Sequence, residues 1–369
     1  SDAPDKAIDG FCQSAGLTRE ALHVRETDKG SFLFANVTET GAVLAEILVP
    51  LINNVINQFP WPKSQRWSRS TVTWVRPLRS ISVLVDGAAI EGEVILGGGM
   101  VMPFGTQALG HPFYTHDPIQ LSDFDSYLGD MKAAHVIVDA ESRREDIMRQ
   151  SGKLADTHGI ELVPDEGLLR EVTGLVEWPH AILGRIQPEF MELPAEVLVT
   201  SMRVHQKFFA TRYPEGHEKS GQLAPYFLTI ANRDCNADQV ALIATGNERV
   251  LKARLADAAF FWHQDNMTPL ETLLPKLGSV AFFDGLGTVA EKADRLANLA
   301  GQFAHYLAGC NEADAVRAAH LSKADLLTGM VGEFPELQGI MGGYYAASGD
   351  ETAAVSQAIS DHYHPQGQS

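Results

Sequence analysis

The sequence is poor in cysteine and has no long apolar run. Its three cysteines are odd in number, far apart, and without the spacing of a metal site, so we interpret them as buried or inert thiols in a reducing compartment: Cys12, Cys235 and Cys310. The best apolar stretch, from Ala42 to Ile56, is interrupted by Glu46 and Pro50, whereas a membrane helix needs about 20 apolar residues. No basic stretch followed by an apolar core opens the chain as in a secretory signal. We therefore expect a cytoplasmic protein without membrane contact.

The chain is also short of positive charge. It has 29 Lys and Arg against 47 Asp and Glu, a formal net charge of −18, which excludes a uniformly basic nucleic-acid binder. Between Arg203 and Arg254, however, eight cations gather: Arg203, Lys207, Arg212, Lys219, Arg233, Arg249, Lys252 and Arg254. Two interpretations remain open. The cluster faces RNA phosphates, or its members pair with nearby acids, as Arg254 and Asp257 could across i,i+3.

Sequence motifs of catalysis are missing as well. The chain has no Gly-x-Ser-x-Gly, no Cys–His constellation and no nucleotide-binding loop. Gly97-Gly98-Gly99 is not followed by Gly-Lys-Ser or Gly-Lys-Thr and opens no helix, so we predict a turn there. His205 adjoins the basic cluster, but a lone histidine beside a strand is typically held by local hydrogen bonds. We predict no catalytic residue in this chain.

The patterns that are present predict an α+β fold. With 369 residues, the chain exceeds one typical core, so we expect two or three domains. We predict a mixed sheet-and-helix body over residues 1–268, with a further division near residue 130, and an all-helical domain over 269–369. In the body, the predicted helices cover residues 41–57, 140–157 and 194–203, and a further helix is capped by Asp165 and ends at Pro179. Predicted strands cover 31–37, 70–75, 80–85, 90–96, 134–138, 181–186, 206–212 and 226–232, with a hairpin turn at Asp86-Gly87.

One helix carries the most information. Residues 246–262 place five apolar side chains at helical spacing, which predicts a buried stripe: Leu251, Leu255, Ala258, Ala259 and Trp262. Asn247 is the predicted N-cap. Packing explains the stripe, but it does not require the three cations Arg249, Lys252 and Arg254 on the same helix.

Several runs, in order along the chain, resemble the β subunit of the two-subunit bacterial glycyl-tRNA synthetase. They are residues 74–79 (WVRPLR), 168–179 (LLREVTGLVEWP), 193–198 (LPAEVL), 201–209 (SMRVHQKFF), 225–232 (PYFLTIAN), 246–262 (GNERVLKARLADAAFFW), 286–288 (LGT) and 323–339 (KADLLTGMVGEFPELQG). The family's N-terminal acidic motif and its C-terminal anticodon-binding domain have no counterpart here, so we expect a central fragment. At His111-Pro112, proline stands where the family usually has arginine, which removes a cation there.

The resemblance implies a subunit that supports aminoacylation without performing its chemical step. In the family, the separate α subunit uses ATP and Mg and activates glycine, while the β subunit supplies tRNA recognition and assembly. The implied partners are therefore the α subunit, in an α2β2 assembly, and glycine tRNA. No cofactor is expected in this chain. The candidate tRNA-binding residues are Arg203, Lys207, Arg249, Lys252 and Arg254.

The helical domain of this family is similar to the HD superfamily of metal-dependent phosphohydrolases. We expect the HD-like domain of this chain, residues 269–369, to be truncated. The adjacent His-Asp pair of that superfamily corresponds to Ala324-Asp325, and alanine cannot coordinate a metal. His305 and His320 lie nearby in sequence without a matching ligand set, so we predict no metal site. The alternatives to a synthetase subunit are an HD-type metal-dependent phosphohydrolase and a stand-alone RNA-binding module.

Overall fold

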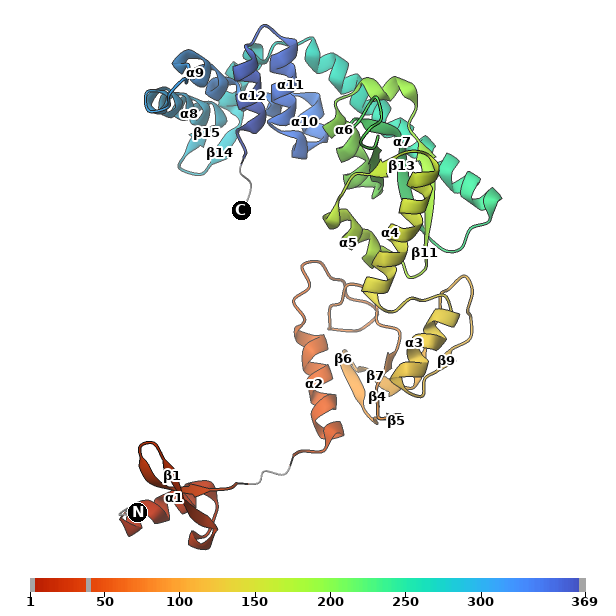
Figure 1. Ribbon diagram of the computed structural model, residues 1–369, viewed down its shortest axis with the longest axis vertical. Helices are drawn as coiled ribbons and strands as arrows, with labels where there is room; N and C mark the ends of the chain where they lie inside the picture. Colours follow the sequence, from red (N-terminus) through yellow and green to blue (C-terminus); the bar gives the residue numbers. More distant parts are fainter. Residues whose placement is uncertain (1–3, 38–40, 365–369) are drawn as a thin grey trace. The chain divides into compact units, whose positions relative to one another are not determined.

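A computed structural model describes residues 4–37 and 41–364 of the chain. Its contacts divide the chain into two compact units, Ser1–Ala108 with Ile119–Tyr127, and Leu109–Pro118 with Leu128–Ser369. Figure 1 shows strands concentrated in the first half of the chain and helices in the second. Within the described ranges, no helix is both long and apolar enough to cross a membrane. The fold is mixed α+β, as expected from the sequence.

The first unit begins with a helix and a hairpin. Its elements are α1 (Asp5–Ala15), β1 (Leu22–Thr27), β2 (Gly30–Ala35) and α2 (Leu44–Gln58). β1 and β2 pair antiparallel around Asp28-Lys29, with Gly30 in the partner register of Thr27. β2 and its turn agree with the strand predicted at 31–37, whereas β1 is not predicted, because its side chains are mostly exposed and show no alternation of burial. The helix predicted from residue 41 begins at Leu44.

Three small sheets follow α2. β3 (Ile81–Ser82), β7 (Met100–Gly105) and β6 (Glu93–Gly97) form the first, in that order, while β4 (Leu84–Val85) pairs with β5 (Ala88–Ala89) and β8 (Gln107–Ala108) pairs with β9 (Ile119–Gln120). Asn53 of α2 fixes the helix on β6, since its amide donates to the Glu93 carbonyl at 2.8 Å and its oxygen accepts from the Ile95 amide at 2.8 Å. The core beneath contains Ile56, Val72, Val94 and Leu96.

Turn predictions in this unit are confirmed, and one strand prediction is wrong. Asp86 and Gly87, with φ of 49° and 76°, join β4 to β5 as a primed turn requires. Gly97 to Gly99 turn β6 into β7. The strand predicted at 70–75 does not form, apart from an isolated bridge between Gln65 and Trp74. There the side chain of Ser70 accepts from the Val72 amide, so the backbone turns locally instead of extending a ladder.

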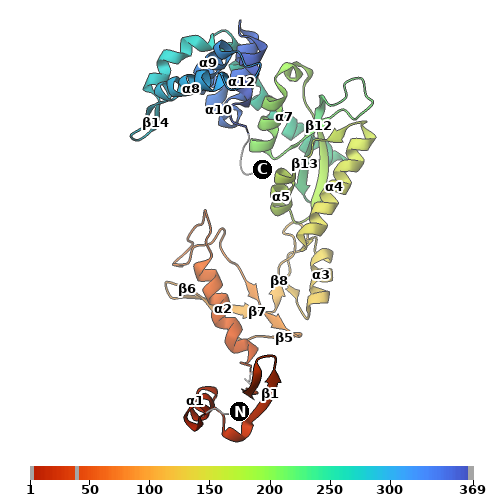
Figure 2. The ribbon, with the colours of Figure 1, turned by 60° about the vertical axis from the view of Figure 1, so that its left-hand side comes forward.

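The second unit is built on a four-stranded antiparallel sheet in the order β10-β12-β13-β11. Its elements, in part visible in Figure 2, are α3 (Phe124–Ala133, which begins in the first unit), α4 (Ala140–Thr157), β10 (Glu161–Leu162), α5 (Glu166–Leu175), β11 (Pro179–Arg185), η2 (Pro188–Glu192), α6 (Ala195–Thr200), the π-helical turn η3 (Ser201–Gln206), β12 (Phe209–Arg212) and β13 (Leu223–Asn232).

The predicted Asp165 cap of α5 is confirmed, since its carboxylate accepts from the Leu168 amide. Phe209 and Leu228 pack with α4 and α5, whereas Ala210 and Phe227 belong to the core that contains the long helix α7 (Ala237–Asn266). Alternating side chains therefore give the sheet two buried faces.

The strand predicted at 134–138 is also wrong. The segment is tied to its neighbours by other bonds: the Ile137 amide donates to the Glu177 carbonyl at 3.0 Å. The Arg143 guanidinium donates to the carbonyls of Ile137 at 2.6 Å and Val138 at 2.8 Å. With its carbonyls occupied by a side chain, this segment forms no strand ladder.

The long helix α7 (Ala237–Asn266) crosses from the sheet to the helical region. It starts at an Asn236 cap, completed by Gln239 in a capping box, so the predicted Asn247 cap is wrong and Asn247 lies inside the helix. The predicted apolar stripe is confirmed at its centre, where Leu251, Leu255 and Ala258 are fully buried. Near its C-terminus, the Asp265 carboxylate accepts from the amides of Gly329 and Met330.

The C-terminal part is helical, with one exception. Its elements are η4 (Leu270–Ser279), β14 (Ala281–Phe283), β15 (Gly287–Thr288), α8 (Val289–Ala304), α9 (Glu312–Leu321), η5 (Ala324–Leu327), α10 (Gly329–Glu333), η6 (Pro335–Leu337), α11 (Ile340–Ser348) and α12 (Ala353–Asp361). The small β14–β15 hairpin corrects the all-helical expectation. One continuous core joins α7 to these helices through residues from Ile186 to Ile359. The domain boundary at 268/269 stays a prediction.

Candidate nucleic-acid interface

Two of the five candidate cations are held by acids of α5. Arg203 lies on the turn after α6 and its Nε donates to Asp165 Oδ2 at 2.5 Å. Lys207, with a left-handed φ of 57°, places its Nζ 2.8 Å from Glu171 Oε1. Burial alone would raise the pKa of Asp165, but hydrogen bonds from Leu168 and Arg203 outweigh it, so the pKa lies below its ordinary value. Both cations therefore fasten the π-helical turn to α5.

A third candidate, Arg254, is paired as well. Its Nη1 donates to Glu333 Oε1 of α10 at 3.0 Å, not to Asp257 one turn further along α7. The i,i+3 pair that local spacing allows does not form, because Arg254 lies at the edge of the buried stripe and reaches Glu333 in the helical region. Arg254 joins α7 to α10 and has little charge left for a ligand.

Arg249 and Lys252 differ from the other three. Both are exposed on α7, one turn apart, and no ion pair to either is found within the described residues. Glu248 would be the natural i,i+4 partner of Lys252, but its Oε1 accepts from the Arg185 amide at 2.9 Å. The acid is thus drawn toward the sheet, and two neighbouring cations face solvent.

The remaining cations of the basic segment contact other groups. Arg212 pairs with Glu161 across β12 and β10, and Arg233 lies over the Phe113 ring, 5.3 Å from its centroid. The segment that is basic in sequence is therefore not one basic surface. Lys219 lies 6.0 Å from the centroid of the Tyr213 ring, and neither it nor Arg233 has an ion pair within the described residues. Among the five candidate residues, only Arg249 and Lys252 have no acidic partner within the described residues.

The residues at the HD-like position do not fit a metal. Ala324 is fully buried, and Asp325 Oδ2 accepts from the amides of Gly339 at 2.5 Å and Gly342 at 3.0 Å, at the start of α11. Burial raises the pKa of Asp325 to about 6 although these bonds oppose it. His305 and His320 pair with acids along α8 and α9: Glu312 and Asp294. In residues 4–37 and 41–364, no three His, Cys, Asp or Glu side chains gather as a metal site would require.

Lys323, next to Ala324 and Asp325, is buried, and no carboxylate of residues 4–37 or 41–364 forms an ion pair with it. Its Nζ lies 2.7 Å from His362 Nε2 and 3.7 Å from the centroid of the Tyr363 ring. Burial lowers the pKa of Lys323 to about 8 and also lowers the pKa of His362. The group packs the end of α12 against η5 rather than forming an open site.

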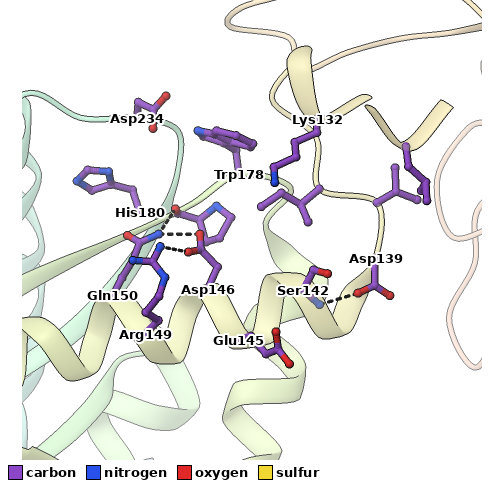
Figure 3. Close-up of a pocket in the computed structure, with 14 residues that line it drawn as sticks. Lys132, Asp139, Ser142, Glu145, Asp146, Arg149, Gln150, Trp178, His180 and Asp234 are labelled. Atoms are coloured by element: carbon purple, nitrogen blue, oxygen red, sulfur yellow. Dashed lines mark hydrogen bonds and ion pairs between the residues drawn. The ribbon is translucent and has the colours of Figure 1, made fainter. Parts of the chain in front are cut away.

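A cavity of about 660 Å³ lies elsewhere in the second unit, beside α4. Figure 3 shows Trp178, His180 and Asp234 around it, together with Asp146 and Gln150 from α4. None of these residues has a role predicted from the sequence, although Trp178 lies in one of the family-like runs, 168–179, and Asp234 stands two positions after another, 225–232. The Trp178-Pro179 pair is the sequence signal that could have indicated this cavity.

Comparison with known proteins identifies the family. A family model described as "Glycyl-tRNA synthetase beta subunit" matches residues 1–369. The chain is 42% identical to the glycine–tRNA ligase β subunit of Rhodospirillum centenum, covering 100% of this chain and 54% of the relative. It is 44% identical to those of Phenylobacterium zucineum and Paracoccus denitrificans, covering 99% and 100% of this chain and 53% of each relative. The chain thus spans about half the length of the curated relatives it matches. A full-length family match and these identities show that the chain belongs to the glycyl-tRNA synthetase β-subunit family.

Proposed function

We propose that this chain is the core of the β subunit of glycine–tRNA ligase and contributes tRNA binding through Arg249 and Lys252. The observation that carries the proposal is the contrast on one basic segment: three candidate cations are neutralised by acids of the chain, and these two are exposed and unpaired within the described residues. Exposed cations one helical turn apart can bind adjacent phosphates and release their counterions.

In this proposal, a separate α subunit uses ATP and Mg to activate glycine, and the two chains assemble as α2β2 in the cytoplasm. The absence of nucleotide-loop motifs in the sequence agrees with that division of labour. The HD-type phosphohydrolase is the weaker alternative, because Ala324 offers no ligand atom and Asp325 is bound to backbone amides. The other alternative, a stand-alone RNA-binding module, differs from a synthetase subunit because it would need no α subunit to function.

A salt series of glycine-tRNA binding tests the two cations. Each phosphate contact contributes to the slope of log K against log salt, so Arg249→Ala and Lys252→Ala should each reduce its magnitude by about 1. Lys153→Ala is the matched control, since Lys153 is an exposed lysine on α4 outside the basic segment. Wild-type affinity and slope in both variants, with unchanged thermal melting, would overturn the assignment.

A further inference from the structure

Trp178 is fixed by its backbone. The side-chain oxygen of Asn232, at the end of β13, accepts from the Glu177 amide at 2.8 Å and the Trp178 amide at 2.9 Å. Pro179 follows and restricts the backbone further. The indole is half-buried and lines the cavity, so one part of it is packed and another is accessible. A rigid aromatic ring at a cavity wall is prepared for stacking before any ligand arrives.

Aromatic rings support the indole from behind. His135 packs edge-on against Trp178, with centroids 4.9 Å apart, and Tyr114 stacks on His135 at 4.1 Å. The Tyr114 hydroxyl accepts from the Asp234 amide at 2.7 Å, which places the loop after β13 beside the same rings. Asp234 Oδ2 lies 3.7 Å from His135 Nε2. Trp178 and Asp234 are thus positioned by a shared neighbour.

The acids around the cavity differ in what they already bind. Asp139 accepts from the Ser142 amide as the cap of α4. Asp146 pairs with Arg149 and accepts from the side-chain amide of Gln150. Within the described residues, the carboxylates of Glu145 and Asp234 accept no hydrogen bond, and Asp234 has only the distant His135 contact. Asp234 is the one of the two that a ring neighbour of Trp178 also contacts, and its exposed oxygens can accept from a ligand. The volume of about 660 Å³ is within the range of small-molecule sites.

We propose that this cavity binds an unpaired guanine base, which stacks on Trp178 and donates from its Watson–Crick edge to the Asp234 carboxylate. Bases of single-stranded RNA are recognised by stacking on aromatic rings and by hydrogen bonds to their edges. Guanine presents two adjacent donors, N1–H and N2–H, which match two carboxylate oxygens; adenine, cytosine and uracil do not offer this pair. The site rests on the proposed function in that the base would belong to the bound tRNA.

Equilibrium dialysis of the complete chain with nucleosides tests the proposal. Guanosine should bind more tightly than inosine, which lacks the N2 amino group, and more tightly than adenosine or uridine. Trp178→Leu should weaken guanosine binding roughly tenfold, while Trp178→Phe keeps most of it, because stacking needs a ring. Asp234→Asn should remove the preference for guanosine over inosine, since an amide offers only one acceptor.

Equal binding of all four nucleosides, or binding of none, would overturn the proposal. Asp234 is exposed, so Asp234→Asn also serves as a variant that keeps its fold. Failure of the guanine-binding proposal can be distinguished from failure of the proposed tRNA-binding function. A cavity that rejects guanosine leaves the salt dependence at Arg249 and Lys252 intact, whereas loss of that salt dependence leaves nucleoside selectivity measurable.

Discussion

Whether a cation can bind RNA depends on whether an acid of the same chain already neutralises it. Arg203, Lys207 and Arg254 are each within 3.0 Å of a carboxylate oxygen. Exposed ion pairs contribute little to stability, about 0–1 kcal/mol, but they occupy the charge that a phosphate would need. Arg249 and Lys252 have no ion pair within the described residues, and Glu248, the i,i+4 neighbour of Lys252, accepts from the Arg185 amide instead.

The buried carboxylate of Asp325 gives a prediction at the same scale. Burial raises its pKa from 3.8 to about 6 in the folded chain, so its protonated form is favoured by folding. The stabilisation is fully present below pH 3.8 and is lost as the pH rises through about 6. Asp325→Asn keeps an acceptor for Gly339 and Gly342 but cannot ionise.

Unfolding by urea at several pH values tests this. The stability of wild type relative to Asp325→Asn should fall from pH 4 to pH 6 and then level off. The buried Lys323, whose pKa is lowered to about 8, titrates in a higher window and is present in both proteins. A stability difference that stays constant between pH 4 and pH 7 would contradict the raised pKa of Asp325.

The sequence identified the cations but not their partners, for a physical reason. Arg203 and Asp165 are 38 positions apart, and Arg254 and Glu333 are 79 apart. Such pairs depend on how helices pack, whereas the i,i+3 pair with Asp257 is what local spacing alone suggests. Trp178 was missed because its support comes from Tyr114 and His135 in another part of the chain.

At the scale of elements, local signals located α4, α5, β11 and β12 well, because each combines a clear period with a cap or a breaker. The helix predicted at 246–262 is shorter than α7, which extends from Ala237 to Asn266. Asn247 fits the rules for an N-cap, but Asn236 also does, and its Gln239 partner completes the capping box. Propensity cannot choose between two caps eleven positions apart when the residues between them tolerate a helix.

Replacing each asparagine distinguishes the two starts. Asn236→Ala removes a side-chain acceptor from the first turn of α7 and should cost about 1 kcal/mol of unfolding free energy. Asn247→Ala, inside the helix, should change stability by less than about 0.5 kcal/mol, because alanine has the higher helix propensity. Denaturant unfolding measures both. A larger cost at Asn247 than at Asn236 would restore the shorter helix.

At the scale of the whole molecule, the described contacts separate two units, each with its own core. Within the second unit, the stripe of α7 packs in one cluster with Phe227 of the sheet and Met341 of α11. Binary patterns along a sequence do not reveal such sharing, because a buried stripe looks the same whether one or two neighbours cover it. The predicted division at 268/269 therefore depends on whether the parts before and after it unfold together or independently.

Hydrogen exchange answers that question. Leu255→Ala opens a cavity in the shared core and should cost about 2–5 kcal/mol. Amide exchange should accelerate in both β13 and α11, because they rest on the same cluster. Leu96→Ala, in the core of the first unit, is the control and should leave both unchanged. Faster exchange in β13 alone after Leu255→Ala would instead support independent domains divided at 268/269.

We propose that this chain contributes tRNA binding to glycine–tRNA ligase without performing glycine activation. The most direct measurement compares two reactions of the reconstituted two-subunit enzyme: tRNA charging and glycine-dependent pyrophosphate exchange. We predict that the Arg249→Ala/Lys252→Ala double variant raises the KM for tRNA several-fold and leaves the exchange reaction unchanged, while Lys153→Ala alters neither. An unchanged KM for tRNA in the double variant, or glycine-dependent exchange by this chain without an α subunit, would contradict the account.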